Sequence, residues 1–276
     1  MACYRFHLMN GFAERRQAGA AVAVVECEAF PDDATLHAIA FQLNAPETVF
    51  IEPGTGRARA FTAQYPLPTS GHGAIAIAAA LEDRLTHAVD FGHGPITTWQ
   101  ENGIWWFYAE APKSRLVVLP VEGLTNALWI EFGDLTGQNL FVDTGLDQLM
   151  VPLRNQHAVL KARPKPEVLA QLADNGRHIP QLALWHQEGD VVTLRSFSSD
   201  QLNVYEEFGA ADSAANIAGW RLATGSVAPF SFKVEQGISI QRVHTRLSVM
   251  HVSVDVRRRI AVGGRMWKIG TGELEF

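Results

Sequence analysis

Two segments of this chain predict helices that are apolar on every face. They cover residues 73–81 and 213–223, and they consist almost entirely of small and apolar residues with hardly any charge. A helix without a polar face has to be buried on all sides. Because Ile75-Ala76 in the first segment aligns with Ile217-Ala218 in the second, we predict a duplicated domain in which strands wrap a central helix. The alternative is that the two segments share only an alanine-rich composition.

Strand signals dominate the rest of the chain. Short β-branched or aromatic runs bounded by Gly, Pro or Asp predict strands at residues 20–25, 48–51, 105–109, 116–119, 191–197, 248–256 and 260–262. Two further helices are predicted at 35–43, where Pro31-Asp32-Asp33 forms a cap signal, and at 164–173. This mixture of many strands and few helices places the chain in the α+β class.

The size and charge of the chain exclude several classes of partner. With 276 residues, the chain is long enough for two domains. The formal charge is -6 and acidic and basic residues are interspersed, so nothing indicates binding to nucleic acid or to an anionic membrane surface. The densest basic run, Arg257-Arg258-Arg259, lies between apolar runs and predicts a turn between two strands.

The two cysteines, Cys3 and Cys27, lie in or beside apolar runs and show no metal-ligand spacing. They predict buried free thiols in a reducing compartment. The N-terminal residues lack the long apolar core of a signal peptide, and no apolar run reaches the roughly 20 residues of a membrane span. A cytoplasmic location is therefore expected, with no membrane contact and no bound metal.

Residues 111–115 predict the crossing between two domains. This segment, Ala-Pro-Lys-Ser-Arg, follows the aromatic run 104–108 and precedes a new apolar run. A proline among polar residues between two strands suits a domain boundary. We therefore predict an N-terminal domain over residues 1–112, which the last residues of the chain could complete, and a C-terminal domain over residues 116–276.

Three titratable residues stand at the edges of apolar elements. Glu47 precedes a Val-Phe-Ile run, and His72 and Asp212 each open one of the two small-residue helices. Two carboxylates and an imidazole that converge in an apolar cleft would suit proton transfer at carbon. Each residue also has a structural interpretation. Glu47 could be a surface or capping residue, His72 a core histidine with its hydrogen bonds satisfied, and Asp212 the N-cap of its helix.

The order of several short motifs resembles the PhzF family of phenazine-biosynthesis isomerase-like proteins, which are related to diaminopimelate epimerase. The motifs span nearly the whole chain and are, in order, Phe12 with Gly19-Ala20-Ala21, Asn44-Ala45-Pro46-Glu47-Thr48-Val49-Phe50, Arg59-Ala60-Phe61-Thr62, Gly71-His72, Arg195-Ser196-Phe197, Asp212-Ser213-Ala214-Ala215-Asn216, Gln236-Gly237, Arg242 and Gly263-Gly264. Each motif is weak alone, and their common order and spacing carry the resemblance.

The resemblance implies both a fold and a chemistry. The fold would be two pseudo-symmetric domains, each a curled, mostly antiparallel sheet or barrel around a central helix as in diaminopimelate epimerase. The active site would lie in the cleft between the domains, and the assembly would be a homodimer. The family's acid/base glutamate falls on Glu47, and its active-site histidine and aspartate fall on His72 and Asp212. The family needs no cofactor, and the implied substrate is a small carboxylic acid.

The resemblance also implies substrate-binding positions at the two helix N-termini. A substrate carboxylate can dock there on backbone N–H groups. The positions that match are Gly71 and Gly73 at the first helix, and Ser213 and Asn216 at the second. Gly73 in particular would permit a close approach of the backbone.

Several positions depart from the family's pattern. Its Gly-Asn-Pro is Gly-Ala-Ala at residues 19–21, and Pro46 replaces the serine before the glutamate. At the second helix, Thr-Gly-Ser becomes Ala-Asn-Ile at residues 215–217, and the side chain of Ile217 cannot donate a hydrogen bond. Because the interval before this helix looks longer than in the family, the alignment could slip there, and Glu207 is the alternative for the acidic role.

Three functions follow as hypotheses. The first is a cofactor-independent isomerase that moves a proton between carbons of a small carboxylic acid, with Glu47 as the acid/base. The second is a degenerate family member that binds a small molecule without turning it over, because several polar positions are lost. The third is a scaffold that binds a partner. A cysteine-pair racemase is not expected, since Cys3 and Cys27 fall in no motif.

Overall fold

The structure of the chain is a computed structural model that describes residues 3–82, 88–136, 138–238 and 246–276. The chain forms two compact units, one of residues 1–108 with 262–276 and one of residues 109–261. Strands outnumber helices among the described elements, which confirms the predicted α+β class. Arg242 lies outside the described residues. None of the described helices is both long enough and apolar enough to cross a membrane.

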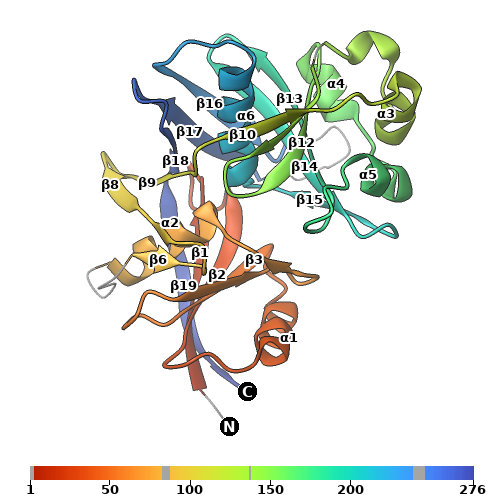
Figure 1. Ribbon diagram of the computed structural model, residues 1–276. Coiled ribbons are helices and arrows are strands. Elements are labelled where there is room, and N and C mark those ends of the chain that lie inside the picture. Colours follow the sequence, from red (N-terminus) through yellow and green to blue (C-terminus); the bar gives the residue numbers. More distant parts are fainter. Residues whose placement is uncertain (1–2, 83–87, 137, 239–245) are drawn as a thin grey trace. The chain divides into compact units, whose positions relative to one another are not determined.

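The first unit contains a six-stranded sheet in which segments from the two ends of the chain pair with each other. Its strands follow the order β19 (Met266–Glu275), β1 (Cys3–Gly11), β2 (Ala20–Glu26), β3 (Glu47–Ile51), β4 (Ala58–Phe61) and β5 (Pro66–Leu67). All neighbours are antiparallel except β2 and β3. In Figure 1, the blue β19 runs along the red β1. The parallel pair needs a crossover connection, and a helix lies in it.

Two helices of this unit pack on opposite faces of the sheet. The crossover helix α1 (Asp33–Leu43) packs in a core cluster with Phe50. The second helix, α2 (Gly71–Leu81), packs in another cluster with Val49. Successive side chains of a strand point to opposite faces, so Val49 and Phe50 mark the two faces. Figure 1 shows α1 and α2 on different sides of β3.

The helix α2 is buried along its whole length, as its lack of a polar face predicted. Each of its 11 residues is buried. It contacts strands of the six-stranded sheet and also β6 (Val89–Asp90), β8 (Thr98–Glu101) and β9 (Ile104–Tyr108). The short β7 (Pro95–Ile96) pairs with β6, and β8 pairs with β9. Elements on several sides therefore enclose this helix.

The second unit is built on a larger sheet. Its strands follow the order β10 (Lys113–Leu116), β11 (Leu140–Asp143), β12 (Asp147–Pro152), β13 (Gln181–Glu188), β14 (Val191–Ser199), β16 (Phe230–Gln236) and β17 (Ser248–Val254), and β15 (Val204–Glu207) pairs with β14. The pairs β12–β13 and β14–β16 are parallel, and the others are antiparallel. The strand β18 (Ile260–Gly264) contains the residues at which the chain passes from this unit back to the first.

A second buried helix, α6 (Ala211–Ala223), packs against this sheet and contacts β10, β11, β12 and β17. The helices α3 (Val121–Leu128), α4 (Gln156–Lys161) and α5 (Pro166–Leu172) pack in a separate core cluster with β11–β14. Figure 1 shows these three green helices grouped together. A 3-10 turn at Phe132–Asp134 follows α3. The two apolar segments singled out in the sequence are thus the buried helices of the two units.

The strand β10 corrects two predictions. A strand was expected at residues 116–119 and an irregular polar crossing at 111–115, but β10 covers Lys113–Leu116. All of its residues are exposed and it pairs with β11 at the edge of the sheet. An exposed edge strand buries neither face, so it lacks the apolar alternation from which a strand is predicted.

At single residues, one alternative interpretation and one prediction are wrong, and one prediction is confirmed. The N-cap of α6 is Ala210, and Asp212 lies within the first turn, so Asp212 is not the cap. Cys3 is exposed, although its apolar neighbours predicted burial, because it is the first residue of β1, where the side chains alternate between exposed and half-buried. The predicted turn near Arg257 and Arg259 is present, and their backbone N–H groups donate to Asp255 Oδ1 at 2.8 and 2.9 Å.

Candidate active site

The structure brings Glu47 and His72 together inside the first unit. Glu47 is the first residue of β3, and His72 is the second residue of α2. The imidazole Nδ1 lies 3.1 Å from Glu47 Oε2, and both residues are buried, with exposed fractions of 8% and 5%. The sequence singled out both residues, and this contact shows that they share one site.

The N-terminal turn of α2 is fixed by a serine that had no predicted role. Ser70 has the extended backbone of an N-cap, and its Oγ accepts a hydrogen bond of 2.7 Å from the Gly73 N–H. This bond satisfies one of the N–H groups that a helix start leaves without an intrahelical partner. The cap sets the direction of the first turn and with it the position of His72. A serine just before a helix of small residues is the sequence signal that identifies such a cap.

The two predicted substrate-binding glycines of α2 are explained by close packing. A Cβ atom at Gly73 would lie 2.5 Å from Val49 Cγ1 and 2.9 Å from Glu47 Oε1. A Cβ atom at Gly71 would lie 2.1 Å from the ring of Phe107. The absence of a side chain at both glycines therefore allows the first turn of α2 to pack closely against Val49 and Phe107. Since the Gly73 N–H already donates to Ser70, Gly73 provides space at the site rather than a donor.

Two polar atoms of the pair remain without a partner. Among the described residues, neither Glu47 Oε1 nor His72 Nε2 has a hydrogen-bond partner, and both atoms are inaccessible to solvent. The ring of Phe12 lies 4.8 Å from the imidazole, which gives it an apolar neighbour. A buried polar atom without a partner costs about 1–3 kcal/mol. This arrangement leaves one carboxylate oxygen and one imidazole nitrogen of the pair unsatisfied by the described residues.

Asp212, the third predicted catalytic residue, belongs to the second unit, where it lies in the first turn of α6. This helix start is held by Gln236, whose Oε1 accepts from the Ala210 N–H at 2.8 Å and whose Nε2 donates to the Glu207 carbonyl at 2.7 Å. That Asp212, or Glu207 in its place, acts with Glu47 stays a prediction.

The side chains of Ser213 and Asn216 are used inside the second unit. Both are fully buried. Ser213 Oγ donates to Gln148 Oε1 at 2.9 Å, and Asn216 Nδ2 donates to the same oxygen at 3.0 Å. Asn216 Oδ1 accepts from Thr144 Oγ1 at 2.7 Å. That these two positions bind substrate stays a prediction, since their side chains are hydrogen-bonded within the unit.

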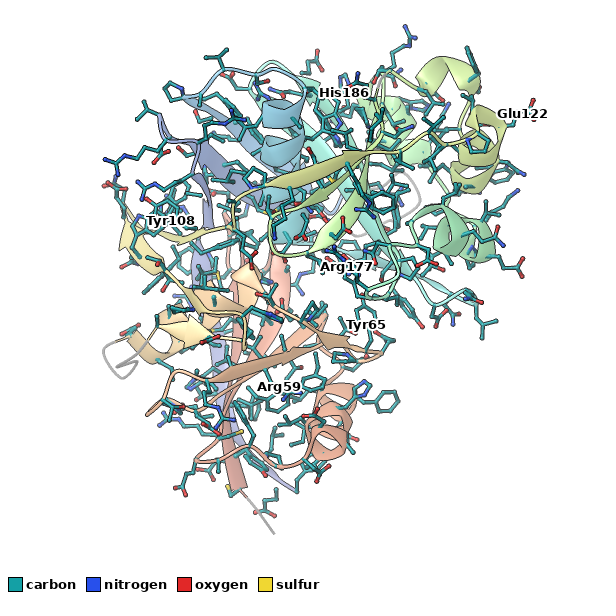
Figure 2. The ribbon with its side chains drawn as sticks, in the orientation of Figure 1. Arg59, Tyr65, Tyr108, Glu122, Arg177 and His186 are labelled. Atoms are coloured by element: carbon teal, nitrogen blue, oxygen red, sulfur yellow. The ribbon has the colours of Figure 1, made fainter. Side chains whose placement is uncertain are left out.

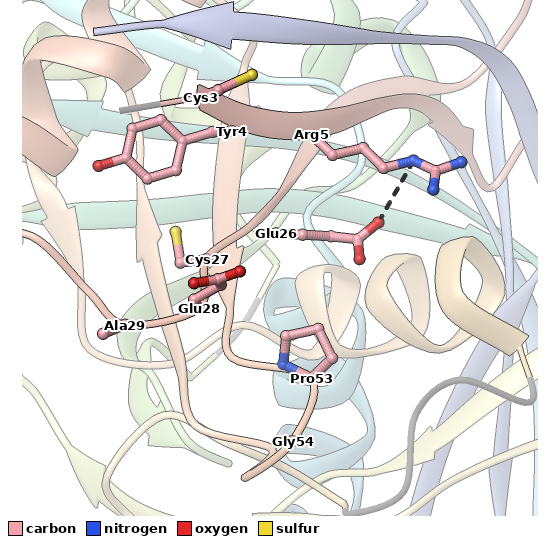
Figure 3. Close-up of a pocket in the computed structure, with 9 residues that line it drawn as sticks. All are labelled: Cys3, Tyr4, Arg5, Glu26, Cys27, Glu28, Ala29, Pro53 and Gly54. Carbon is pink, nitrogen blue, oxygen red and sulfur yellow. Dashed lines mark ion pairs between the residues drawn. The ribbon is translucent and has the colours of Figure 1, made fainter. Parts of the chain in front are cut away.

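The described pockets lie away from the Glu47–His72 pair. One, in the first unit, is lined by residues of β1 and β2 and the loops beside them, including Cys3, Cys27, Arg5 and Glu26 (Figure 3). The other, in the second unit, is lined by Arg115, Asp147 and Arg177, among others; Arg177 is labelled in Figure 2. In the described part of the chain, no group of three or more His, Cys, Asp or Glu residues is arranged to hold a metal ion.

Comparisons with known proteins agree on one family. Residues 9–268 match the family described as phenazine biosynthesis-like protein. An uncharacterized isomerase of Pasteurella multocida is 29% identical over 98% of this chain and 94% of its own length. The structure of a predicted epimerase from Pseudomonas aeruginosa has a TM-score of 0.81 at 21% identity, and it covers 99% of both chains.

A second solved structure, a PhzF-family phenazine biosynthesis protein from Bacillus anthracis, has a TM-score of 0.79 at 19% identity over the whole of both chains. At these identities the two structures support the fold alone. The match to the family covers nearly the whole chain. The chain therefore belongs to the phenazine biosynthesis-like, or PhzF, family.

Proposed function

We propose that this protein is an isomerase that moves a proton between carbons of a small carboxylic-acid metabolite without a cofactor. The observation that carries the proposal is the Glu47 carboxylate. One of its oxygens contacts His72, and the other is buried at the start of α2 with no partner in the part of the chain that the structure describes. A carboxylate held in an apolar environment with one free oxygen is a suitable acid/base for a carbon acid.

In this mechanism Glu47 both takes and returns the proton. Its Oε1 accepts a proton from one carbon, the C–H bond breaks, and the electron pair spreads into the unsaturated substrate. The carboxylic acid then gives a proton to a second carbon, and exchange of its proton with solvent before this step would bring deuterium into the product in heavy water. His72 orients the carboxylate through Nδ1. The N-terminus of α2 is an anion-binding end of a helix, and it would stabilise the substrate's negative charge.

The family relationship supports this function. The Pasteurella multocida relative is named an isomerase, as is a relative in Clostridium acetobutylicum that is 25% identical over 87% of this chain and 87% of its own length. Glu47 and His72, onto which the resemblance places the family's glutamate and histidine, contact each other in the first unit. We propose that Asp212 binds or protonates the same substrate.

Proton exchange in heavy water tests the proposal. Wild-type protein and the Glu47→Gln variant are incubated with a panel of small unsaturated and amino carboxylates, and deuterium incorporation is measured by mass spectrometry. We expect one compound class to gain deuterium with wild type and none with Glu47→Gln, because the amide cannot accept the proton. Glu28→Gln, which changes an exposed glutamate, is the matched control and should exchange like wild type.

The same assay separates the roles of the other residues. Both Asp212→Asn and His72→Asn should lower the rate at which deuterium enters the compound that wild-type protein exchanges. Equal exchange by wild type and Glu47→Gln would contradict the proposal. Saturable binding of a panel compound without any exchange would instead favour a protein that binds the substrate and does not turn it over.

A further inference from the structure

We propose that Gly11 is a positioning residue for His72. The missing side chain at the end of β1 lets the imidazole lie where its Nδ1 reaches Glu47. The catalytic meaning of this role rests on the proposed function, because His72 matters to the reaction only if Glu47 is the acid/base. The geometric claim is independent of any substrate and can be measured on the protein alone.

The imidazole of His72 occupies the space that a side chain at position 11 would fill. A Cβ atom at Gly11 would lie 2.2 Å from His72 Nε2, 2.8 Å from His72 Cδ2 and 3.1 Å from Met266 Sδ. In real structures a Cβ atom essentially never lies closer than 3.0 Å to a heavy atom outside its own and the adjacent residues. Gly11 is not among the residues with a positive φ, so alanine could adopt its backbone conformation. The requirement for glycine at this position is therefore a requirement for space.

The backbone of Gly11 cannot move away from the ring. Gly11 pairs with Ala20 on one side and with Met266 on the other, so β1 is held between two strands. Behind it, a Cβ atom at Gly19 would lie 2.2 Å from the Gly11 carbonyl oxygen, which shows how closely the following loop is packed. A side chain at position 11 would therefore displace the imidazole rather than the strand.

Phe12, the residue after Gly11, packs against the imidazole of His72. Phe12 is fully buried and has a φ of 55°, a left-handed conformation that is uncommon for a residue other than glycine and is often found at functional sites. Its ring lies 4.8 Å from the His72 ring with an interplanar angle of 36°. With Phe12 and Gly11 both against the ring, the displaced imidazole would have to turn, and its Nδ1 would leave Glu47 Oε2.

The test measures the contact between His72 and Glu47 directly. Protein with ¹⁵N-labelled histidine is prepared as wild type and as Gly11→Ala, each with and without Glu47→Gln, and the His72 signals are assigned from His72→Asn. In the wild-type background, Glu47→Gln should shift the His72 Nδ1 resonance. In the Gly11→Ala background the same change should leave it unshifted. Gly270→Ala, at a glycine with no heavy atom within 4 Å of its Cβ position, should retain the wild-type response.

A shift on Glu47→Gln that is equally large in Gly11→Ala would overturn the proposal. This readout needs no turnover, so failure of the exchange assay and failure of this proposal are distinguishable. If Gly11→Ala alone does not fold, removing the imidazole decides the question. The double variant Gly11→Ala/His72→Ala should then fold with the melting temperature of His72→Ala. A double variant that also fails to fold would place the role of Gly11 in the strand and overturn the proposal.

Discussion

Buried polar side chains in this protein fall into two kinds. Arg195 is 2% exposed, and its guanidinium donates to both carboxylate oxygens of Glu206, at 2.7 and 3.2 Å, and to the carbonyls of Val159, Leu160 and Ala162. Such a group has its charge and donors compensated within the fold. The pairs of Glu47 with His72 and of His7 with Glu26 are different, because Glu47 Oε1, His72 Nε2 and His7 Nδ1 are buried without a partner among the described residues. Of these two pairs, that of Glu47 and His72 leaves such an atom on both of its residues, so it is the stronger candidate for a functional site.

The two cysteines should differ in their reactivity at a given pH. Burial, with the nearby charge of Glu52, raises the pKa of Cys27 to about 12. Desolvation and the charges of Glu273 and Glu275 raise the pKa of the exposed Cys3 thiol. Since only the thiolate is the nucleophile, iodoacetamide at pH 8 should modify Cys3 slowly, and Cys27 should stay unmodified while the protein is folded.

Peptide mass spectrometry of the modified cysteines checks this prediction over a pH series. The rate at Cys27 should keep rising towards pH 12, because the raised pKa keeps the thiol protonated below that value. The variant Cys3→Ser should remove the modification seen at pH 8 and leave the modification of Cys27 at higher pH. Modification of Cys27 at pH 8 as fast as that of Cys3, in folded protein, would contradict the assigned burial.

At the scale of single elements, the two central helices begin in different ways. The start of α2 is capped by the side chain of Ser70, whereas α6 has Ala210 at its N-cap and is held there by Gln236 from β16. The first arrangement depends on one local residue and the second on a residue far along the chain. A local signal can be found in the sequence, and a long-range contact cannot.

Replacing Ser70 by alanine should destabilise the first unit. The Gly73 N–H would lose its buried acceptor, and loss of an N-cap side chain costs about 0.5–2 kcal/mol. Denaturant unfolding, with the midpoint and slope fitted together, measures the loss. The exposed N-cap of α1 provides a matched control, and Asp32→Ala should cost less because water can replace its bond to Thr35. An unchanged midpoint for Ser70→Ala would show that the cap is not needed.

Elements could be predicted where local pattern decides them. The helices α2 and α6 followed from segments without a polar face, and β2, β3 and β14 followed from apolar runs. The strands β1 and β19 were not predicted, because both carry many exposed or half-buried residues and because each pairs with a strand from the opposite end of the chain.

At the candidate site, too, only residues with a local sequence signal could be predicted. Glu47 and His72 stand out in the sequence because each is a titratable residue at the edge of an apolar element. Gly11 carried no signal, because its role depends on space that another segment fills. Motif order can identify positions within a family, but it cannot show which backbone atoms must lie against a side chain.

At the scale of the whole molecule, the two units differ in how they use the chain. The second is one continuous stretch, residues 109–261, whereas the first combines residues 1–108 with residues 262–276. The C-terminal segment supplies β19, which pairs with β1 along nine positions from Cys3 to Gly11. Trp267 Nε1 also donates to the Ala13 carbonyl at 2.6 Å, and Lys268 Nζ donates to the Ala80 carbonyl at 2.9 Å.

This topology predicts which fragments can fold. Residues 1–108 alone should not form a cooperative structure, because β1 would lose a partner strand and the core around α2 would lose Met266. Joining residues 262–276 to residue 108 through a flexible Gly/Ser linker should restore it, since all strands of the first unit's sheet are then present. Circular dichroism and amide NMR of the two fragments measure the difference. As a control, residues 1–108 joined to residues 262–276 in scrambled order should behave like residues 1–108 alone. Dispersed amide signals and cooperative unfolding of residues 1–108 alone would show that the first unit folds without β19.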